Sequence, residues 1–168
     1  MSELELNPDK DGETHINIYS KGKTDLGRLL TNLANTPFDY KDHHFGSVEA
    51  LWYWLLSDKK RMDFIPLNGF DAKKLSKTLS KEDIVEIDDD FRSEICEGFR
   101  CKLRCNKNIV KMLFESELPF THYYYYGKDG NYKIMDLPQH KWQCEEYEKL
   151  RSIIKEFYKP KISNKPKI

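Results

Sequence analysis

The sequence predicts a single α+β domain in which helices surround a small sheet. Short strand-like runs alternate with longer segments in which apolar residues recur at helical spacing, and this mixture is typical of α+β domains. The length of 168 residues is that of one domain. A chain of this length can bury roughly 70% of its unfolded surface. No internal repeat or low-complexity segment divides it.

Helix start signals stand at three places in the first half of the chain. Ser47, Asp58 and Asp71 are residue types whose side-chain oxygens accept a backbone N–H in the first turn of a helix. In chain order, the predicted elements are a strand over about 16–19, a loop with short helical character over 25–35, a strand around 38–40, a helix from 47 to about 57, a short turn from 58 to 66 and a helix from 71 to 79.

The second half has the strongest helical repeat, which begins after Asp90 with apolar residues at positions 91, 95, 99 and 103. A second helix is expected from Asn108. The runs HYYYYG and NYKIM flank Lys128-Asp129-Gly130, which is a hairpin signal. An amphipathic helix over 142–157 is expected to close the domain.

Charge is balanced overall and segregated at the ends. The 28 basic and 28 acidic residues give no global field, so nucleic acid must be contacted by a local patch. Residues 1–13 carry five acidic residues and one basic residue and are expected to form a flexible tail, and residues 159–168 are expected to form a basic tail. The domain itself is expected over residues 14–158.

The chain carries no signal for a membrane, a disulfide framework or a metal. No apolar run approaches the ~20 residues that span a bilayer, and the start lacks a signal-peptide pattern, so we expect a cytoplasmic monomer. Three of the four cysteines lie within ten residues on one predicted helix, which favours reduced thiols. Their spacing does not match a metal site, and no metal or other cofactor is expected.

One acid stands out in the predicted helix after Ser47. Glu49 lies in its first turn and shares a face with Trp52, Tyr53 and Leu56. An acid on an aromatic stripe is costly to bury without a partner, so it is a candidate catalytic carboxylate. The alternative is a solvated acid that the helix dipole favours.

The tyrosine run 123–126 alternates faces if it is a strand, so two rings pack inward and two face out. The outward pair, including Tyr124, can stack a nucleobase. His43 and His44 are placed in a polar loop, where a solvated role is expected rather than a catalytic one.

Five segments of the chain together resemble a known family. They are INIYS, GRLLTNLANTPF, FGSVEALWYWLL, GFDAKKLSKTL and FRCKLRCNKNIVKMLFES, which extend over roughly residues 14–118. Their order and spacing resemble the NADAR family of N-glycosidases, a superfamily that includes ADP-ribosyl-guanosine hydrolases and enzymes of the riboflavin-biosynthesis type. The resemblance implies a NADAR-like fold.

Two departures limit what the resemblance carries over. Many members of the family have a lysine seven residues after the helix glutamate, where this chain has Leu56. The late Trp-Gly-x-Gly element is replaced by LPFTHYYYYGKDG, which resembles a subgroup found in bacteria and their phages. A phage protein would act in the host cytoplasm.

The resemblance also implies a set of substrate-binding residues. Arg28, Thr31 and Asn32 lie in the element that lines the family's pocket. A forked contact from Arg28 to a diphosphate competes with a surface ion pair to Asp25. Asn32 can bond a ribose hydroxyl or a base edge. Trp52, Tyr53 and Tyr124 are the aromatic candidates.

Cleavage of an N-glycosidic bond develops positive charge on the anomeric carbon of the ribose, and a fixed carboxylate stabilises that transition state. Glu49 is the candidate for this role or for orienting the attacking water. Families of this kind can also trap the opened sugar on a neutral lysine. Lys73 and Lys102 are the candidates here, against the alternative that each is a charge on a helix surface.

The function implied by the resemblance is removal of ADP-ribose from guanine bases of nucleic acid, with DNA as the expected partner. Such an enzyme would reverse a toxin ADP-ribosyltransferase, as an antitoxin or a phage counter-defence. One alternative is an N-glycosidase acting on small phosphoribosyl metabolites such as riboflavin intermediates. Another is a non-catalytic module that binds ADP-ribose. Turnover separates the module from both enzymes.

Overall fold

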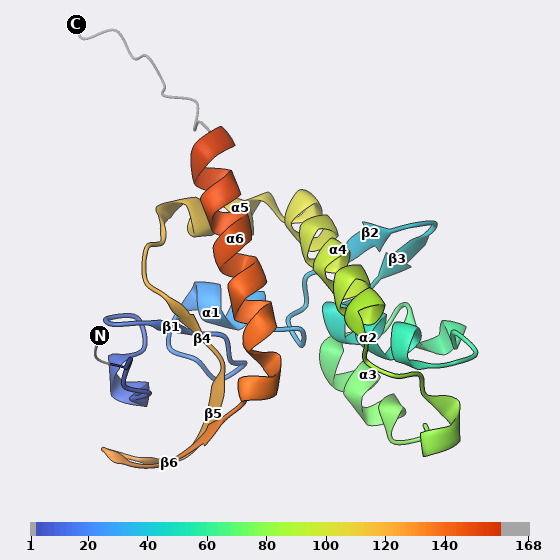
Figure 1. Cartoon of the computed structure of the whole chain (residues 1–168), viewed down its shortest axis with the longest axis horizontal. Coiled ribbons are helices and arrows are strands. Elements are labelled where there is room, and N and C mark those ends of the chain that lie inside the picture. Colours follow the sequence, from blue (N-terminus) through green and yellow to red (C-terminus); the bar gives the residue numbers. More distant parts are fainter. Residues whose placement is uncertain (1–2, 159–168) are drawn as a thin grey trace, which may run out of the picture.

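The computed structural model describes residues 3–158, which form one α+β domain (Figure 1). Its helices, in chain order, are α1 (Asp25–Leu30), α2 (Val48–Leu56), α3 (Gly69–Ser76), α4 (Asp89–Cys105), α5 (Lys107–Glu115) and α6 (Lys141–Phe157). Its strands are β1 (Ile16–Asn17), β2 (Phe38–Tyr40), β3 (His43–Phe45), β4 (Phe120–Thr121), β5 (Tyr123–Lys128) and β6 (Asn131–Asp136). Short 3₁₀ turns cover Pro8–Lys10, Met62–Phe64, Lys81–Asp83 and Pro138–His140. None of the helices described is long and apolar enough to cross a membrane.

The strands form three separate two-stranded ladders rather than one small sheet. β1 pairs with β4 in parallel, whereas β2 with β3 and β5 with β6 are antiparallel. In the predicted hairpin, Asp129 and Gly130 both have positive φ, 51° and 82°, as a two-residue type I′ turn requires. His43 and His44 belong to β3, so the prediction that they lie in a loop is wrong.

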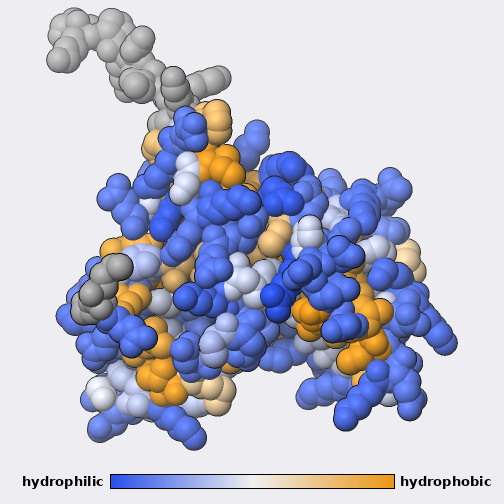
Figure 2. Space-filling model, in the orientation of Figure 1, coloured by the Kyte–Doolittle hydropathy of each residue, from blue (hydrophilic) through white to orange (hydrophobic). Residues whose placement is uncertain are grey.

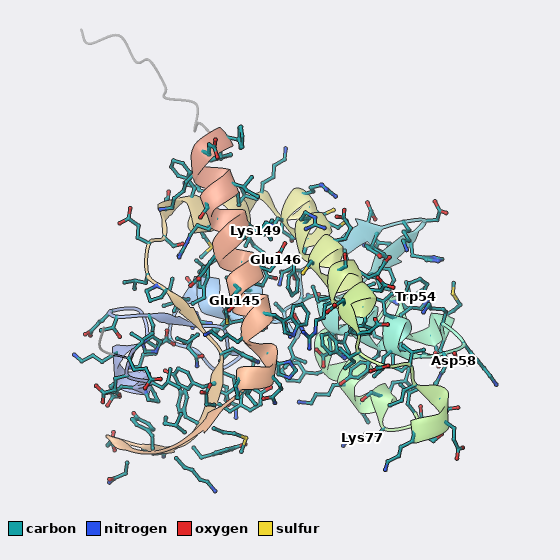
Figure 3. The ribbon with its side chains drawn as sticks, in the orientation of Figure 1. Trp54, Asp58, Lys77, Glu145, Glu146 and Lys149 are labelled. Atoms are coloured by element: carbon teal, nitrogen blue, oxygen red, sulfur yellow. The ribbon has the colours of Figure 1, made fainter. Side chains whose placement is uncertain are left out.

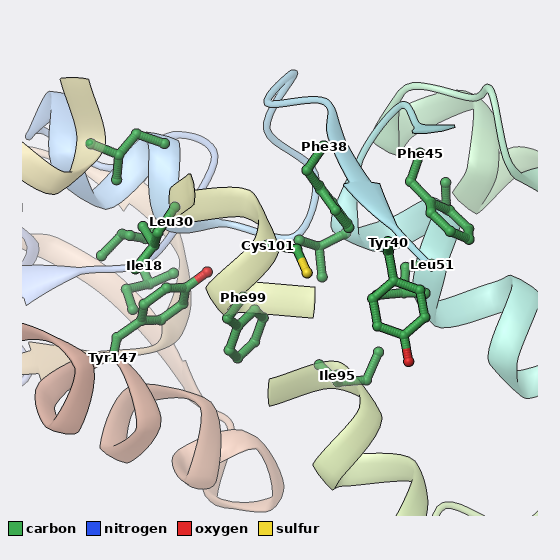
Figure 4. Packing of buried hydrophobic residues seen from close by; sticks show 14 of the residues in the cluster. Ile18, Leu30, Phe38, Tyr40, Phe45, Leu51, Ile95, Phe99, Cys101 and Tyr147 are labelled. Atoms are coloured by element: carbon green, nitrogen blue, oxygen red, sulfur yellow. The ribbon is translucent and has the colours of Figure 1, made fainter. Parts of the chain in front are cut away.

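The core is built where α4 packs against α2 and β2 on one side and α6 on the other. Figure 4 shows Ile95 and Phe99 of α4 between Tyr147 of α6 and the side chains of Tyr40 and Leu51. All five side chains are buried, and the rings of Phe99 and Tyr147 stack with centroids 4.5 Å apart. Each fully buried side chain of this size contributes roughly 1.5–3 kcal/mol, so this layer holds the helices together.

Ser47 caps α2 as predicted, since its Oγ accepts the N–H of Ala50 at 3.1 Å. Other boundaries differ from the prediction by one to three residues. α3 is capped by Asn68 rather than Asp71, because Asn68 Oδ1 accepts the N–H of Asp71, and the helix ends at Ser76 rather than at residue 79. α4 is capped by Asp88, α5 begins at Lys107, and no helix is capped by Asp58.

Much of the predicted N-terminal tail is packed onto the domain. The carboxylate of Asp11 is buried and accepts the backbone N–H groups of Asn17 at 2.9 Å and Lys23 at 2.8 Å. Pro8 is buried as well. The domain therefore begins before residue 14. The predicted basic tail at 159–168 lies outside the described residues.

Gly69 lets the start of α3 approach the loop after α1. A Cβ at this position would lie 2.3 Å from Cα and 2.5 Å from the carbonyl oxygen of Leu33. The obstacle is backbone, which cannot rotate away, so we expect Gly69→Ala to lower the free energy of unfolding by about 1–3 kcal/mol. Urea unfolding measures this. Lys74→Ala, at an exposed position of the same helix, is the control and should change stability by less than about 0.5 kcal/mol.

Candidate functional site

A cavity of about 420 Å³ lies where the loops after β1 and α1 meet α2, α3, β5 and the start of α6. In the space-filling view, the molecule is notched between the lobe formed by β5 and β6 and the lobe formed by α2 and α3 (Figure 2). The cavity is lined by Ile18, Tyr19, Ser20, Thr31, Asn32, Leu33, Glu49, Trp52, Tyr53, Phe70, Lys73, His122, Tyr124, Tyr126, His140, Gln143 and Tyr147.

Glu49 enters the cavity from the first turn of α2. Its backbone N–H donates to the carbonyl oxygen of Asn32 at 2.9 Å, which fixes the helix start against the loop after α1. Burial raises the pKa of the Glu49 carboxyl, and the hydrogen bond from Tyr53 and the charge of Lys73 only partly offset this. The side chain is half-buried in the cavity wall, so Glu49 is not a solvated first-turn acid.

Two phenols accompany this carboxyl. Burial and the negative charge of Glu49 raise the pKa of Tyr53 to about 12, and Tyr53 also hydrogen-bonds Ser76 of α3. Burial, and then Glu49, raise the pKa of Tyr124. Both phenols therefore stay neutral hydrogen-bond donors at neutral pH. Tyr124 packs on Tyr19 with ring centroids 5.2 Å apart.

Trp52 forms the aromatic wall one turn further along α2. Its ring packs edge-on against Phe91, with centroids 4.9 Å apart, and lies 6.2 Å from the rings of both Trp142 and His140. His140 therefore lies beside the indole that follows Glu49 by about one turn of α2.

Two histidines line the cavity, and each is held in one orientation. Nδ1 of His122 donates to the carbonyl oxygen of Ile18 at 2.6 Å. Asn32 Nδ2 donates to Gln143 Oε1 at 3.0 Å, so the amide nitrogen of Gln143 faces His140 Nδ1 at 3.4 Å. Burial lowers the pKa of both imidazoles, and for His140 the neighbouring His122 lowers it further. Both are therefore neutral at pH 7.

The mouth of the cavity has a different character from its interior. Phe70 of α3 is 63% exposed and Tyr126 of β5 is 58% exposed, although both line the cavity. Lys73 is exposed beside them and is the only lysine or arginine among the described lining residues. An anionic group of a ligand is therefore favoured at the mouth.

Two of the predicted site residues lie outside this cavity. Arg28 pairs with Asp25 and donates to the carbonyl oxygen of Gly22 at 2.6 Å, which is the surface ion pair foreseen as the alternative. Lys102 is fully buried in α4, and its Nζ donates to the carbonyl oxygen of Thr31 at 3.1 Å. Burial lowers the pKa of Lys102 to about 7. It is not a helix-surface charge, and it supports a residue of the cavity wall.

The other predicted residues come together around one space, namely Thr31, Asn32, Glu49, Trp52, Tyr53, Lys73 and Tyr124. Sequence reasoning missed the contribution of α6. Gln143 and Tyr147 of this helix line the cavity, together with His140 of the 3₁₀ turn directly before it, and the three recur at i, i+3 and i+7. The hydroxyl of Tyr147 is buried and has no hydrogen-bond partner among the described residues.

The tyrosine run behaves as the predicted alternation requires. Tyr123 is fully buried, and Tyr125 turns to the same side as Tyr123, where its hydroxyl donates to the carbonyl oxygen of Lys21. Tyr124 and Tyr126 face the cavity. His122, which begins this run, was not singled out by the sequence analysis, and its position one residue before the alternating strand is the signal that could have found it.

Comparisons with known proteins agree with the fold. No protein-family model and no curated protein sequence matches the chain. Among solved structures, it is similar to the NMR structure of the Escherichia coli protein YbiA, with a TM-score of 0.64 and 15% sequence identity. The similarity covers 89% of this chain and 92% of YbiA. Since YbiA is a NADAR-family protein, the chain has a NADAR-like fold, as its sequence motifs predict.

Proposed function

We propose that the protein is an N-glycosidase that removes ADP-ribose from guanine bases of ADP-ribosylated nucleic acid, with DNA as the polymer, and so reverses a toxin ADP-ribosyltransferase. The observation that carries the proposal is the half-buried carboxyl of Glu49 in an aromatic cavity. The NADAR-like fold and the sequence resemblance support the same chemistry.

Glu49 is assigned to the anomeric carbon of the ribose that is cleaved from the base. As the bond to the base breaks, positive charge develops on this carbon, and a carboxylate held in a poorly solvated wall stabilises it more strongly than one in water. Tyr53 donates to this carboxyl and Lys73 lies close enough to favour its ionised form. The oxygen of a water molecule then bonds to the anomeric carbon, and one proton of this water ends on the guanine nitrogen that leaves, so the products are ADP-ribose and the unmodified base.

The charges at the cavity set the orientation of the ligand in this proposal. Lys73 at the mouth contacts the diphosphate, while the sugar enters beside Glu49. Lys74 is exposed on the same helix as Lys73, and Lys77 is exposed directly after the last residue of α3 (Figure 3). These lysines provide a local patch for the phosphates of the polymer, which a chain with no net charge needs.

Neither candidate lysine combines access to the cavity with a desolvated amine, which favours direct attack by water over a covalent intermediate. Lys73 is exposed at the mouth, and Lys102 is neutral in part but enclosed in the core. Borohydride tests this point, because it reduces an imine between a lysine and the opened ribose to a stable amine. We expect no adduct, and a mass increase on residue 73 or 102 would contradict direct hydrolysis.

The substrate is tested by incubating the protein separately with ADP-ribosylated DNA, free ADP-ribose and a phosphoribosyl pyrimidine, and following release by mass spectrometry. We expect release of ADP-ribose from the DNA alone. Release only from the small phosphoribosyl compound would replace the proposed substrate with a metabolite. Tight binding of ADP-ribose without turnover of any substrate would make the protein a binding module.

The raised pKa of Glu49 predicts a pH dependence. If the carboxylate is the active form, kcat/KM should fall as the pH decreases, with a midpoint above the ordinary glutamic acid value of 4.5. Tyr53→Phe removes a hydrogen bond that lowers this pKa, so the midpoint should move to higher pH. A pH–rate profile of both proteins measures the shift. An unchanged midpoint in Tyr53→Phe would show that another group controls the acid limb.

A further inference from the structure

The two histidines of the cavity present complementary nitrogens. A carbonyl oxygen only accepts, so the bond to Ile18 places the proton of His122 on Nδ1 and leaves a lone pair on Nε2. The amide nitrogen of Gln143 only donates, so His140 accepts at Nδ1 and carries its proton on Nε2. One ring therefore offers an acceptor and the other a donor.

Both nitrogens are available to a ligand. Neither Nε2 has a hydrogen-bond partner among residues 3–158, and both rings line the cavity. The ring centroids are 5.9 Å apart at an angle of 59°. This separation is compatible with two neighbouring hydroxyl groups that each bond to one ring, since a hydroxyl both donates and accepts.

We propose that His122 and His140 bind the vicinal hydroxyl groups of the terminal ribose of ADP-ribose. The inference rests on the proposed function, because that function places this ribose beside Glu49. Trp52 connects the two positions, since it lies one turn after Glu49 and packs on His140. Because both imidazoles are neutral at pH 7, they suit an uncharged diol better than a phosphate.

The test compares the binding of ADP-ribose with that of ADP, which lacks the terminal ribose. Asparagine is the informative replacement, because its amide reaches the position of Nδ1 and has no atom at Nε2. His122→Asn keeps a donor for Ile18, and His140→Asn keeps an acceptor for Gln143. Each variant should bind ADP-ribose about tenfold more weakly, which corresponds to roughly 1.4 kcal/mol, and bind ADP unchanged.

His44→Asn is the matched control, because His44 also uses Nδ1, bonding Asp39 at 2.7 Å outside the cavity. It should retain the full preference for ADP-ribose. His122→Gln places its amide near the position of Nε2 and should retain part of the preference. If an asparagine variant does not fold, the phenylalanine variant keeps the ring volume and should give the same loss.

The outcomes separate this inference from the proposed function. Wild-type protein that turns over ADP-ribosylated DNA, with both asparagine variants retaining the preference for ADP-ribose, would overturn only the role of the histidines. Wild-type protein that prefers ADP-ribose but turns over no substrate would overturn the proposed hydrolysis, and a loss of the preference in the variants would still support diol binding. Wild-type protein that neither prefers ADP-ribose nor turns over a substrate would overturn both.

Discussion

Glu49→Gln should reduce turnover of ADP-ribosylated DNA by at least about 10²-fold, or about 2.7 kcal/mol of barrier, while the protein stays folded. Glutamine keeps the shape and can still bond Tyr53, but it removes the negative charge that faces the anomeric carbon. Affinity for ADP-ribose should change much less, because the interaction strengthens only as charge develops. Single-turnover kinetics and calorimetry measure the two quantities.

Glu49→Gln should raise the stability of the protein although it lowers turnover. The folded-state pKa of Glu49 is raised, so the folded protein holds this proton more tightly than the unfolded chain does. The ionised side chain therefore destabilises the fold above a pH of about 4.5, the ordinary value, and Glu49→Gln should be more stable at pH 7. This gain should vanish at lower pH, where both states are protonated.

Glu145→Gln is the control for both measurements, since Glu145 is exposed on the outer face of α6 (Figure 3). It should leave turnover and stability unchanged. A folded Glu49→Gln protein with wild-type turnover would falsify the assignment of the catalytic carboxyl.

Lys102→Met should stabilise the protein at pH 7 and destabilise it at high pH. Burial lowers the pKa of Lys102 from 10.5 to about 7, so between these values the folded protein binds fewer protons than the unfolded chain. Wild-type stability therefore rises with pH across this window, by an amount on the order of 4 kcal/mol. Methionine keeps the length of the side chain and removes this dependence.

Lys102→Met also loses the hydrogen bond to Thr31, and this loss reduces the gain in stability over wild type. It costs about 1 kcal/mol, so the net gain of Lys102→Met at pH 7 is on the order of 3 kcal/mol. Above pH 10.5, lysine is neutral in both the folded and the unfolded state, so only the loss of this hydrogen bond remains and the variant is less stable than wild type. Urea unfolding at pH 7, 9 and about 11 follows the change of sign. Lys111→Met, at an exposed position of α5, is the control and should show no change of sign. If the stability of Lys102→Met and that of wild type depend on pH in the same way, the lowered pKa of Lys102 is wrong.

Local signals in the sequence predicted the parts of the site that depend on neighbouring residues. Ser47 and the stripe after it placed Glu49, Trp52 and Tyr53 on one helix face, and the alternation of the tyrosine run placed Tyr124 toward the cavity. These features are set by helical and strand periodicity alone.

What the sequence did not predict depends on contacts between distant segments. His122 is held by Ile18, which is 104 positions away, and His140 is held through Gln143 by Asn32. Lys102 lies three residues after Phe99 on the buried face of α4, but lysine is so rarely buried that its residue type argues for a surface position. Arg28 was assigned by resemblance, and the nearby Asp25 and Gly22 satisfy its guanidinium instead.

The parallel pairing of β1 with β4 constrains when this protein can become active during its synthesis. Asn17 and Thr121 are register partners that lie 104 positions apart. A nascent chain that has not yet presented residues 120–121 outside the ribosome cannot form this pair, and His122 and His140 emerge still later. β1 therefore stays without its partner strand β4 while about a hundred residues are added, at roughly 5–20 residues per second. Activity should accordingly appear only after residues 120–143 have left the ribosome.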